Sequence, residues 1–132
     1  MPRTPLQVMA DHYIIAAIWA DCPEGTHPRA TMQARRVALQ VCDEFMRAAG
    51  PLLTEACNRP GYGSHPDFGT EHPAYAAAGH DLYLTSQGHG AGFWDRKPLR
   101  EGDLGDRLTR IAKRFCTEPD FYRGWLYLHR CG

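Results

Sequence analysis

The residues with the clearest chemical potential are histidines and carboxylates that lie close together in the chain. An imidazole can act as a general acid or base or can bind a metal ion, and a neighbouring carboxylate can orient it or share the ion. Between residues 65 and 95 the chain carries four of each type, namely His65, His72, His80, His89, Asp67, Glu71, Asp81 and Asp95. Because no H-x-x-x-H or H-E-x-x-H pattern occurs among them, a His/Asp-based metalloenzyme is the second alternative of the functions considered below.

Other signatures of catalysis or cofactor binding do not occur in the sequence. Gly88, Gly90 and Gly92 alternate, match neither the dinucleotide-binding pattern nor the P-loop pattern, and predict a turn. There is no Gly-x-Ser-x-Gly nucleophile motif. The five cysteines contain no C-x-x-C pair and predict reduced thiols. We therefore predict no catalytic residue, no cofactor and no metal ligand, and the sequence favours a protein without enzymatic activity.

A second group of candidate residues is basic and has helical spacing. Arg107, Arg110 and Arg114 recur at i, i+3 and i+7, and Lys113 lies beside them, so one side of a helix would present a cationic ridge. Three further cations precede that helix, namely Arg96, Lys97 and Arg100. The first alternative function is therefore nucleic-acid binding, which would depend strongly on salt because phosphate contacts release counterions.

Two helices are expected in the first half of the chain. Apolar residues at helical spacing predict the first over Leu6 to Ala20 and the second over Thr31 to Ala49. Gly50-Pro51 should end or kink the second helix, and Leu52 to Cys57 could add another helical turn.

The segment from about residue 58 to residue 73 is predicted to be a Pro/Gly-rich loop. Loops of this length inside a compact domain are often functional. Four of its side chains could anchor it or bind a ligand, namely Tyr62, His65, Phe68 and His72.

The stretch from Gly79 to Arg96 is interpreted as a β-hairpin. Leu82 to Thr85 and Gly92 to Asp95 supply the two strands, and the glycine-rich residues between them supply the turn. In this interpretation His89 lies at an exposed tip, and Trp94 is a buried contact of the sheet.

The base of this hairpin would bring charged residues together. If the strands pair symmetrically about Gly88, Asp81 faces Asp95 and His80 faces Arg96. We expect an ion pair between Arg96 and Asp81 to help hold the strands in register.

The remaining elements complete a small α+β domain. Asp103 is a candidate N-cap for a third helix over Leu104 to Phe115, and Trp125 to His129 predicts a strand. The sequence therefore predicts one α+β domain over residues 1–132, with a small antiparallel sheet, made of the hairpin and the C-terminal strand, packed against about three helices.

Composition limits the partners. The chain has 15 basic and 15 acidic residues and a pI near 7.0, so a nucleic-acid partner would need a local patch rather than an overall charge. Its longest apolar stretch, Tyr13 to Ala20, is too short to span a bilayer, and no membrane partner is expected. These features predict a cytoplasmic protein and indicate no oligomeric state.

The chain resembles a family of small proteins encoded by bacteriophages and phage-like elements. That family carries a run similar to GHDFWLTRNGHGAGFWDR, which matches Gly79 to Arg96, after a helical half that begins like Tyr13 to Trp19; Leu104 to Phe115 also match. The family is acidic and ends in an acidic strand, whereas this chain is neutral and ends in Trp125 to Cys131. The resemblance implies a genomic context and a fold, and no activity.

From these observations we expect a non-enzymatic phage or mobile-element accessory protein that binds a host protein in the host cytoplasm, for example an inhibitor of a defence system such as CRISPR-Cas. The link from phage origin to this activity is an analogy. The predicted partner-binding residues are His89, Arg96, Arg107, Arg110, Lys113 and Arg114.

Overall fold

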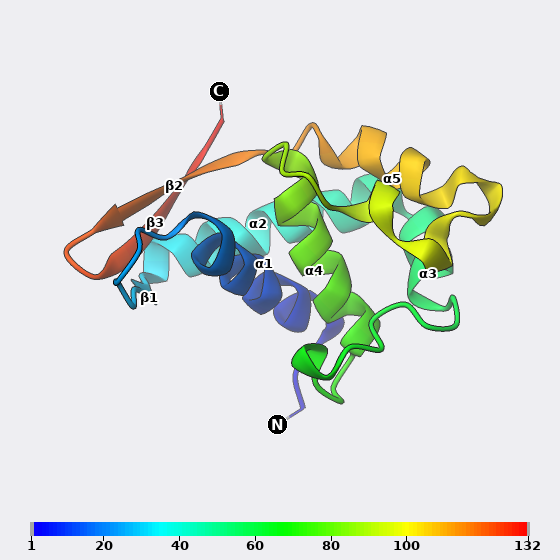
Figure 1. The fold of residues 1–132 in the computed structure, drawn as a ribbon, viewed down its shortest axis with the longest axis horizontal. Helices are drawn as coiled ribbons and strands as arrows, with labels where there is room; N and C mark the ends of the chain where they lie inside the picture. Colours follow the sequence, from blue (N-terminus) through cyan, green and yellow to red (C-terminus); the bar gives the residue numbers. More distant parts are fainter. Residues whose placement is uncertain (1, 132) are drawn as a thin grey trace.

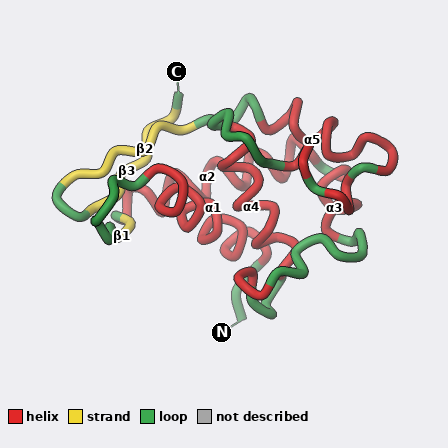
Figure 2. The backbone as a smooth tube through the Cα atoms, viewed as in Figure 1, coloured by secondary structure: helices red, strands yellow, loops and turns green. Residues whose placement is uncertain are grey.

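The computed structural model describes residues 2–131 and shows an α+β protein (Figure 1). Its elements are α1 (Pro5–Asp21), β1 (Arg29–Ala30), α2 (Met32–Ala49), α3 (Pro51–Cys57), α4 (Pro73–Ser86), α5 (Leu104–Ala112), β2 (Thr117–Tyr122) and β3 (Trp125–Arg130). The strands gather at one end of the long axis and α3 lies at the other, as the colouring by structure type makes clear (Figure 2). None of the described helices is long and apolar enough to cross a membrane.

The two N-terminal helices form where the sequence predicts them. Thr4 caps α1 in a reciprocal arrangement, since its hydroxyl accepts from the Gln7 backbone and the Gln7 side chain accepts from the Thr4 backbone. Thr31 caps α2 by accepting from the amide of Ala34. Both helices bury one stripe of apolar side chains, as their spacing requires.

The predicted break after the second helix is also confirmed. Gly50 adopts a positive φ between α2 and α3, and Pro51 begins α3. The following loop contains only a short 3₁₀ turn, Pro66–Phe68, before α4 begins at Pro73.

The predicted hairpin between Gly79 and Arg96 is wrong. Leu82–Thr85 belongs to α4, and its intended partner forms a 3₁₀ turn, Phe93–Asp95. α4 is buried on nearly every side, so its sequence has no polar face and shows no helical period that separates it from a buried strand. Gly79 lets α4 approach α1 closely, because a Cβ there would clash with the backbone of Met9; the two helices lie side by side in Figure 1.

The residues of the predicted hairpin therefore have other surroundings than expected. Trp94 is 45% exposed, so it is not a buried sheet contact. Leu82, Leu84 and Phe93 are buried in the core, but they lie on α4 and the 3₁₀ turn and not in the sheet. The facing pairs that the hairpin implied do not form as strand neighbours, although Arg96 does reach Asp81 from the loop that follows α4.

The sheet itself is mixed rather than antiparallel. Its order is β1-β3-β2, with β1 parallel to β3 and β2 antiparallel to β3. The C-terminal strand is confirmed as β3, but β1 and β2 were not predicted. β2 contains Pro119, which sheets tolerate on an edge strand because its missing N–H faces outward. With α3 and α4 added, the described helices number five rather than about three.

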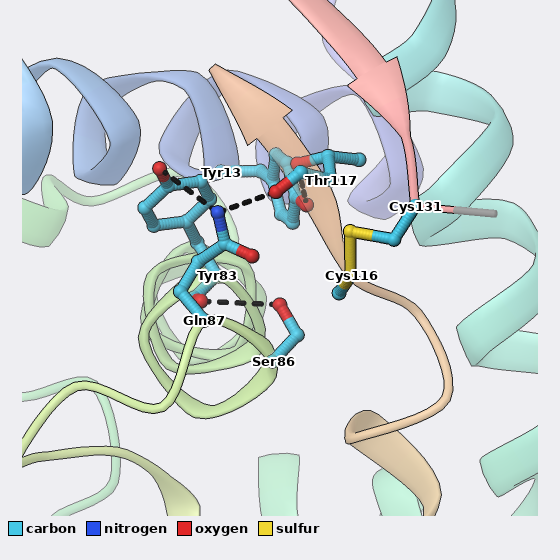
Figure 3. Close-up of a disulfide and its surroundings, with 7 residues drawn as sticks. All are labelled: Tyr13, Tyr83, Ser86, Gln87, Cys116, Thr117 and Cys131. Atoms are coloured by element: carbon cyan, nitrogen blue, oxygen red, sulfur yellow. Dashed lines mark hydrogen bonds between the residues drawn. A yellow bond between two sulfur atoms is a disulfide. The ribbon is translucent and has the colours of Figure 1, made fainter.

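A disulfide between Cys116 and Cys131 joins the two ends of the β2–β3 hairpin, so the prediction of reduced cysteines is wrong for this pair (Figure 3). Cys42 is buried in the core as a free thiol. Beside the disulfide the Gln87 amide nitrogen donates to the Tyr83 hydroxyl and the Thr117 carbonyl, which ties the end of α4 to β2.

Candidate functional site

A pocket of about 520 Å³ opens between α1, the Pro/Gly-rich loop, α4 and the segment from Ala91 to Pro98. Pockets of 300–1,000 Å³ with apolar walls and a few polar groups are the usual form of a ligand site. The side chains that define it are His12, Trp19, Tyr62, Phe68, His80, Asp81 and Arg96.

The floor of the pocket is a buried ion pair. Asp81 is 1% exposed, and its Oδ1 accepts from Nε of Arg96 at 2.9 Å and from Nη2 at 2.6 Å. The Tyr62 hydroxyl donates to Oδ2 at 2.8 Å. Burial raises the pKa of Asp81, while Arg96 and Tyr62 act against this by stabilising the carboxylate. Three donors on one carboxylate indicate that Asp81 is ionised and that its role is to hold the loop and the Arg96 segment against α4.

The wall of the pocket is aromatic and has Phe68 at its centre. The rings of His12, His65 and His80 lie edge-on to Phe68, with centroids 5.9, 6.2 and 5.9 Å away. Trp19 packs against His80 with centroids 5.5 Å apart, yet remains 70% exposed. Trp19 therefore places a largely exposed aromatic ring beside the pocket.

The imidazoles of His12 and His80 line the pocket, and burial favours their neutral forms. Burial lowers the pKa of both, and the positive charge of Arg3 lowers that of His12 further. For His80 the carboxylate of Asp81 acts against the effect of burial, and Arg96 adds to it. Neither ring forms a hydrogen bond with another described side chain, and every buried polar side-chain atom of the described chain has a partner. The free ring nitrogens of these histidines therefore face space that a ligand can reach.

The structure separates the six predicted partner-binding residues. Arg96 lies in the pocket. His89 follows the C-terminal end of α4, and its Nε2 is 3.1 Å from Oδ2 of Asp21. The same Oδ2 accepts a hydrogen bond from the Tyr83 hydroxyl at 2.5 Å. His89 is thus half-buried and anchored instead of projecting from an exposed tip.

The four basic residues predicted on the third helix are all exposed. Arg107 and Arg110 lie on α5, and Lys113 and Arg114 directly follow it. Arg114 also lies over the ring of Phe115, 5.9 Å from its centroid. None of the four lines the pocket, so they form a separate surface whose role stays a prediction.

The His/Asp cluster of the metalloenzyme alternative is not assembled. His80 and Asp81 line the pocket, His89 is bound to Asp21, and Asp95 is exposed on the 3₁₀ turn. Within residues 2–131 there is no group of three His, Cys, Asp or Glu side chains placed to hold a metal ion.

Sequence reasoning found part of the pocket and missed the rest. Tyr62 and Phe68 were named as possible binding groups of the loop, and His80 as a candidate for chemistry. His12 and Trp19 were not identified as site residues. The signal that could have found Trp19 is its position on α1, outside the predicted apolar stripe, where a large aromatic ring has no core to enter.

Comparisons of this chain with protein-family models, with curated proteins and with solved structures found no match. Its function is therefore inferred from the geometry of the pocket.

Proposed function

We propose that this chain is a non-enzymatic binding protein that holds a host protein at the aromatic pocket. The observation that carries the proposal is the pocket mouth, where Trp19 and Ile15 are 70% and 49% exposed beside the half-buried rings of His80 and Phe68. Tryptophan is among the residues that most often dominate the energy of protein interfaces, especially next to a pocket from which water can be expelled.

Binding is favoured over catalysis because the charged groups of the pocket are already engaged. Asp81 already accepts three hydrogen bonds from Arg96 and Tyr62, so it is a poor general base. His80 and His12 have no carboxylate hydrogen-bonded to the ring to orient it as a base, in contrast to the usual catalytic arrangement.

The biological setting of the proposal rests on the resemblance of Gly79 to Arg96 to phage-encoded proteins. It supports a phage or mobile-element accessory protein acting in the host cytoplasm, for which inhibition of a host defence system such as CRISPR-Cas is one specific activity. The pocket itself supports only the binding of a partner.

The test is a pull-down from host lysate with a matched pair of tryptophan variants. Trp19→Ala removes an exposed ring at the pocket, and Trp125→Ala removes an exposed ring on β3, outside the pocket. If Trp19 is a hot spot worth at least 2 kcal/mol, its loss should weaken capture by about 30-fold or more. The Trp125 variant should capture the partner as the unaltered chain does.

Equal capture by both variants would overturn the assignment of the pocket. Recovery of no stoichiometric partner across several hosts would overturn the function. Each variant must first give the melting temperature of the unaltered protein, which is expected because both rings are exposed.

Nucleic-acid binding remains a second candidate because Arg107, Arg110, Lys113 and Arg114 are all exposed. Labelled DNA and RNA titrated at low salt test it, with all four residues changed to glutamine as the control. Because low salt is the most permissive condition for phosphate contacts, an absence of binding there removes this candidate.

A further inference from the structure

We propose that the pocket receives an uncharged aromatic side chain of the partner protein, a tyrosine or a tryptophan. This inference rests on the proposed function and adds the chemistry of the group that the partner inserts. Size, wall chemistry, hydrogen-bonding capacity and charge each contribute to it.

The size and walls suit a flat ring. The cavity of about 520 Å³ is bordered by Trp19 and Phe68, with the imidazole of His80 in contact with both rings. A ring that enters this space can make offset or edge-to-face contacts with each of them, which stabilise aromatic pairs beyond the area that they bury. An aliphatic side chain would bury area there but gain none of these contacts.

The polar groups of the pocket suit a ring that carries one polar hydrogen. In its neutral form an imidazole has one acceptor nitrogen and one N–H donor, and the rings of His12 and His80 lack a partner among the described side chains. A tyrosine hydroxyl or a tryptophan N–H can donate to such an acceptor. Phenylalanine would leave these nitrogens without a partner once water is expelled, which costs free energy.

Charge decides against ions and nucleotides. Burial lowers the pKa of His12 and of His80, and a cationic ligand placed beside them would meet the same desolvation cost. An anionic ligand would meet a guanidinium already neutralised by Asp81, together with the exposed carboxylate of Asp67 at the rim. A nucleobase would bring its phosphates toward that carboxylate, so a protein side chain is favoured.

The experiment is an NMR titration of the full chain with blocked amino acids. N-acetyltryptophanamide and N-acetyltyrosinamide are the probes, and the phenylalanine, leucine and arginine amides and uridine monophosphate are the comparisons. We expect the first two to bind tightest and to shift the imidazole resonances of His12 and His80.

The variant His80→Phe keeps an aromatic ring in place and removes its nitrogens. It should weaken the tyrosine and tryptophan amides by about fivefold, the loss expected for one uncharged hydrogen bond, and should not weaken the phenylalanine amide, which no longer leaves the His80 nitrogens without a partner. Trp125→Ala serves as the control and should bind every probe as the unaltered chain does.

The inference is overturned if no aromatic amide binds, if leucine amide binds as well as they do, or if the arginine amide or uridine monophosphate binds tightest. Its failure is distinguishable from failure of the proposed function. Aromatic amides that bind without any captured host protein would support the pocket chemistry and refute the host partner. A captured partner that depends on Trp19, without amide binding, would do the reverse.

Discussion

Removing Arg96 should destabilise the fold by an amount that depends on pH, because it leaves the carboxylate of Asp81 buried and unpaired. Breaking a buried ion pair by removing one partner costs about 3–5 kcal/mol. Arg96 keeps 32% of its side chain exposed, so solvent already screens part of the pair and the lower end applies, about 3 kcal/mol.

Protonation of Asp81 limits this penalty. The ordinary carboxyl pKa is 3.8, and each pH unit above it adds about 1.36 kcal/mol to the cost of neutralising the group. The unpaired charge can therefore cost no more than about 5 kcal/mol at pH 7.5 and about 1.6 kcal/mol at pH 5. Without Arg96 the pKa of Asp81 is raised further, so the loss of stability in Arg96→Ala shrinks as the pH falls.

Thermal unfolding at both pH values measures the effect. For 132 residues with an unfolding entropy of about 2.1 cal/mol/K per residue, 1 kcal/mol shifts Tm by about 3.6 °C. Arg96→Ala should thus lower Tm by about 11 °C at pH 7.5 and by about 6 °C or less at pH 5. The matched control is Arg100→Ala, an exposed arginine outside the pocket, which should change Tm little at either pH.

A double variant tests whether the unpaired charge of Asp81 causes this loss of stability. Adding Asp81→Asn to Arg96→Ala removes the unpaired carboxylate, so the double variant should be more stable than Arg96→Ala alone at pH 7.5. A Tm of Arg96→Ala that is unchanged, or that falls equally at the two pH values with no rescue by Asp81→Asn, would refute the assignment of Asp81 as a buried, ionised partner.

Four further predictions concern the packing, the disulfide and His80. Gly79→Ala should destabilise by about 3 kcal/mol or more, since its Cβ would meet the backbone of α1, whereas Gly90→Ala, which has open space around it, should be neutral by thermal unfolding. Cys131→Ser opens a disulfide that spans 15 residues, so without reductant the variant should be about 3 kcal/mol less stable than the unaltered chain. With reductant the two proteins should be equally stable. Burial lowers the pKa of His80 from 6.5, so the unfolded chain binds more protons than the folded chain, and the free energy of unfolding should fall as the pH drops below about 6.5. Denaturant titrations at a series of pH values measure this dependence, and His80→Phe should lose the part that comes from His80. Trp94→Ala should change Tm little because the ring is largely exposed, and a large loss would place it in the core after all.

The first two helices and the last strand could be predicted from the order of the amino acids alone. Their signals are local: Thr4 and Thr31 satisfy the free amides at the helix starts, and apolar residues recur at the helical period. β3 alternates buried and exposed residues, and Gly50-Pro51 marks a break that the backbone must make. These rules need no knowledge of distant residues.

α4 and the pocket depend instead on packing between segments that are distant in the chain. A segment buried on all sides has no polar face, so Leu82–Thr85 fits a strand as well as a helix until α1 packs against Gly79. The pocket brings together His12, Phe68, His80 and Arg96 from four segments. No spacing rule relates them, because their proximity follows from how the helices pack and not from their order along the chain.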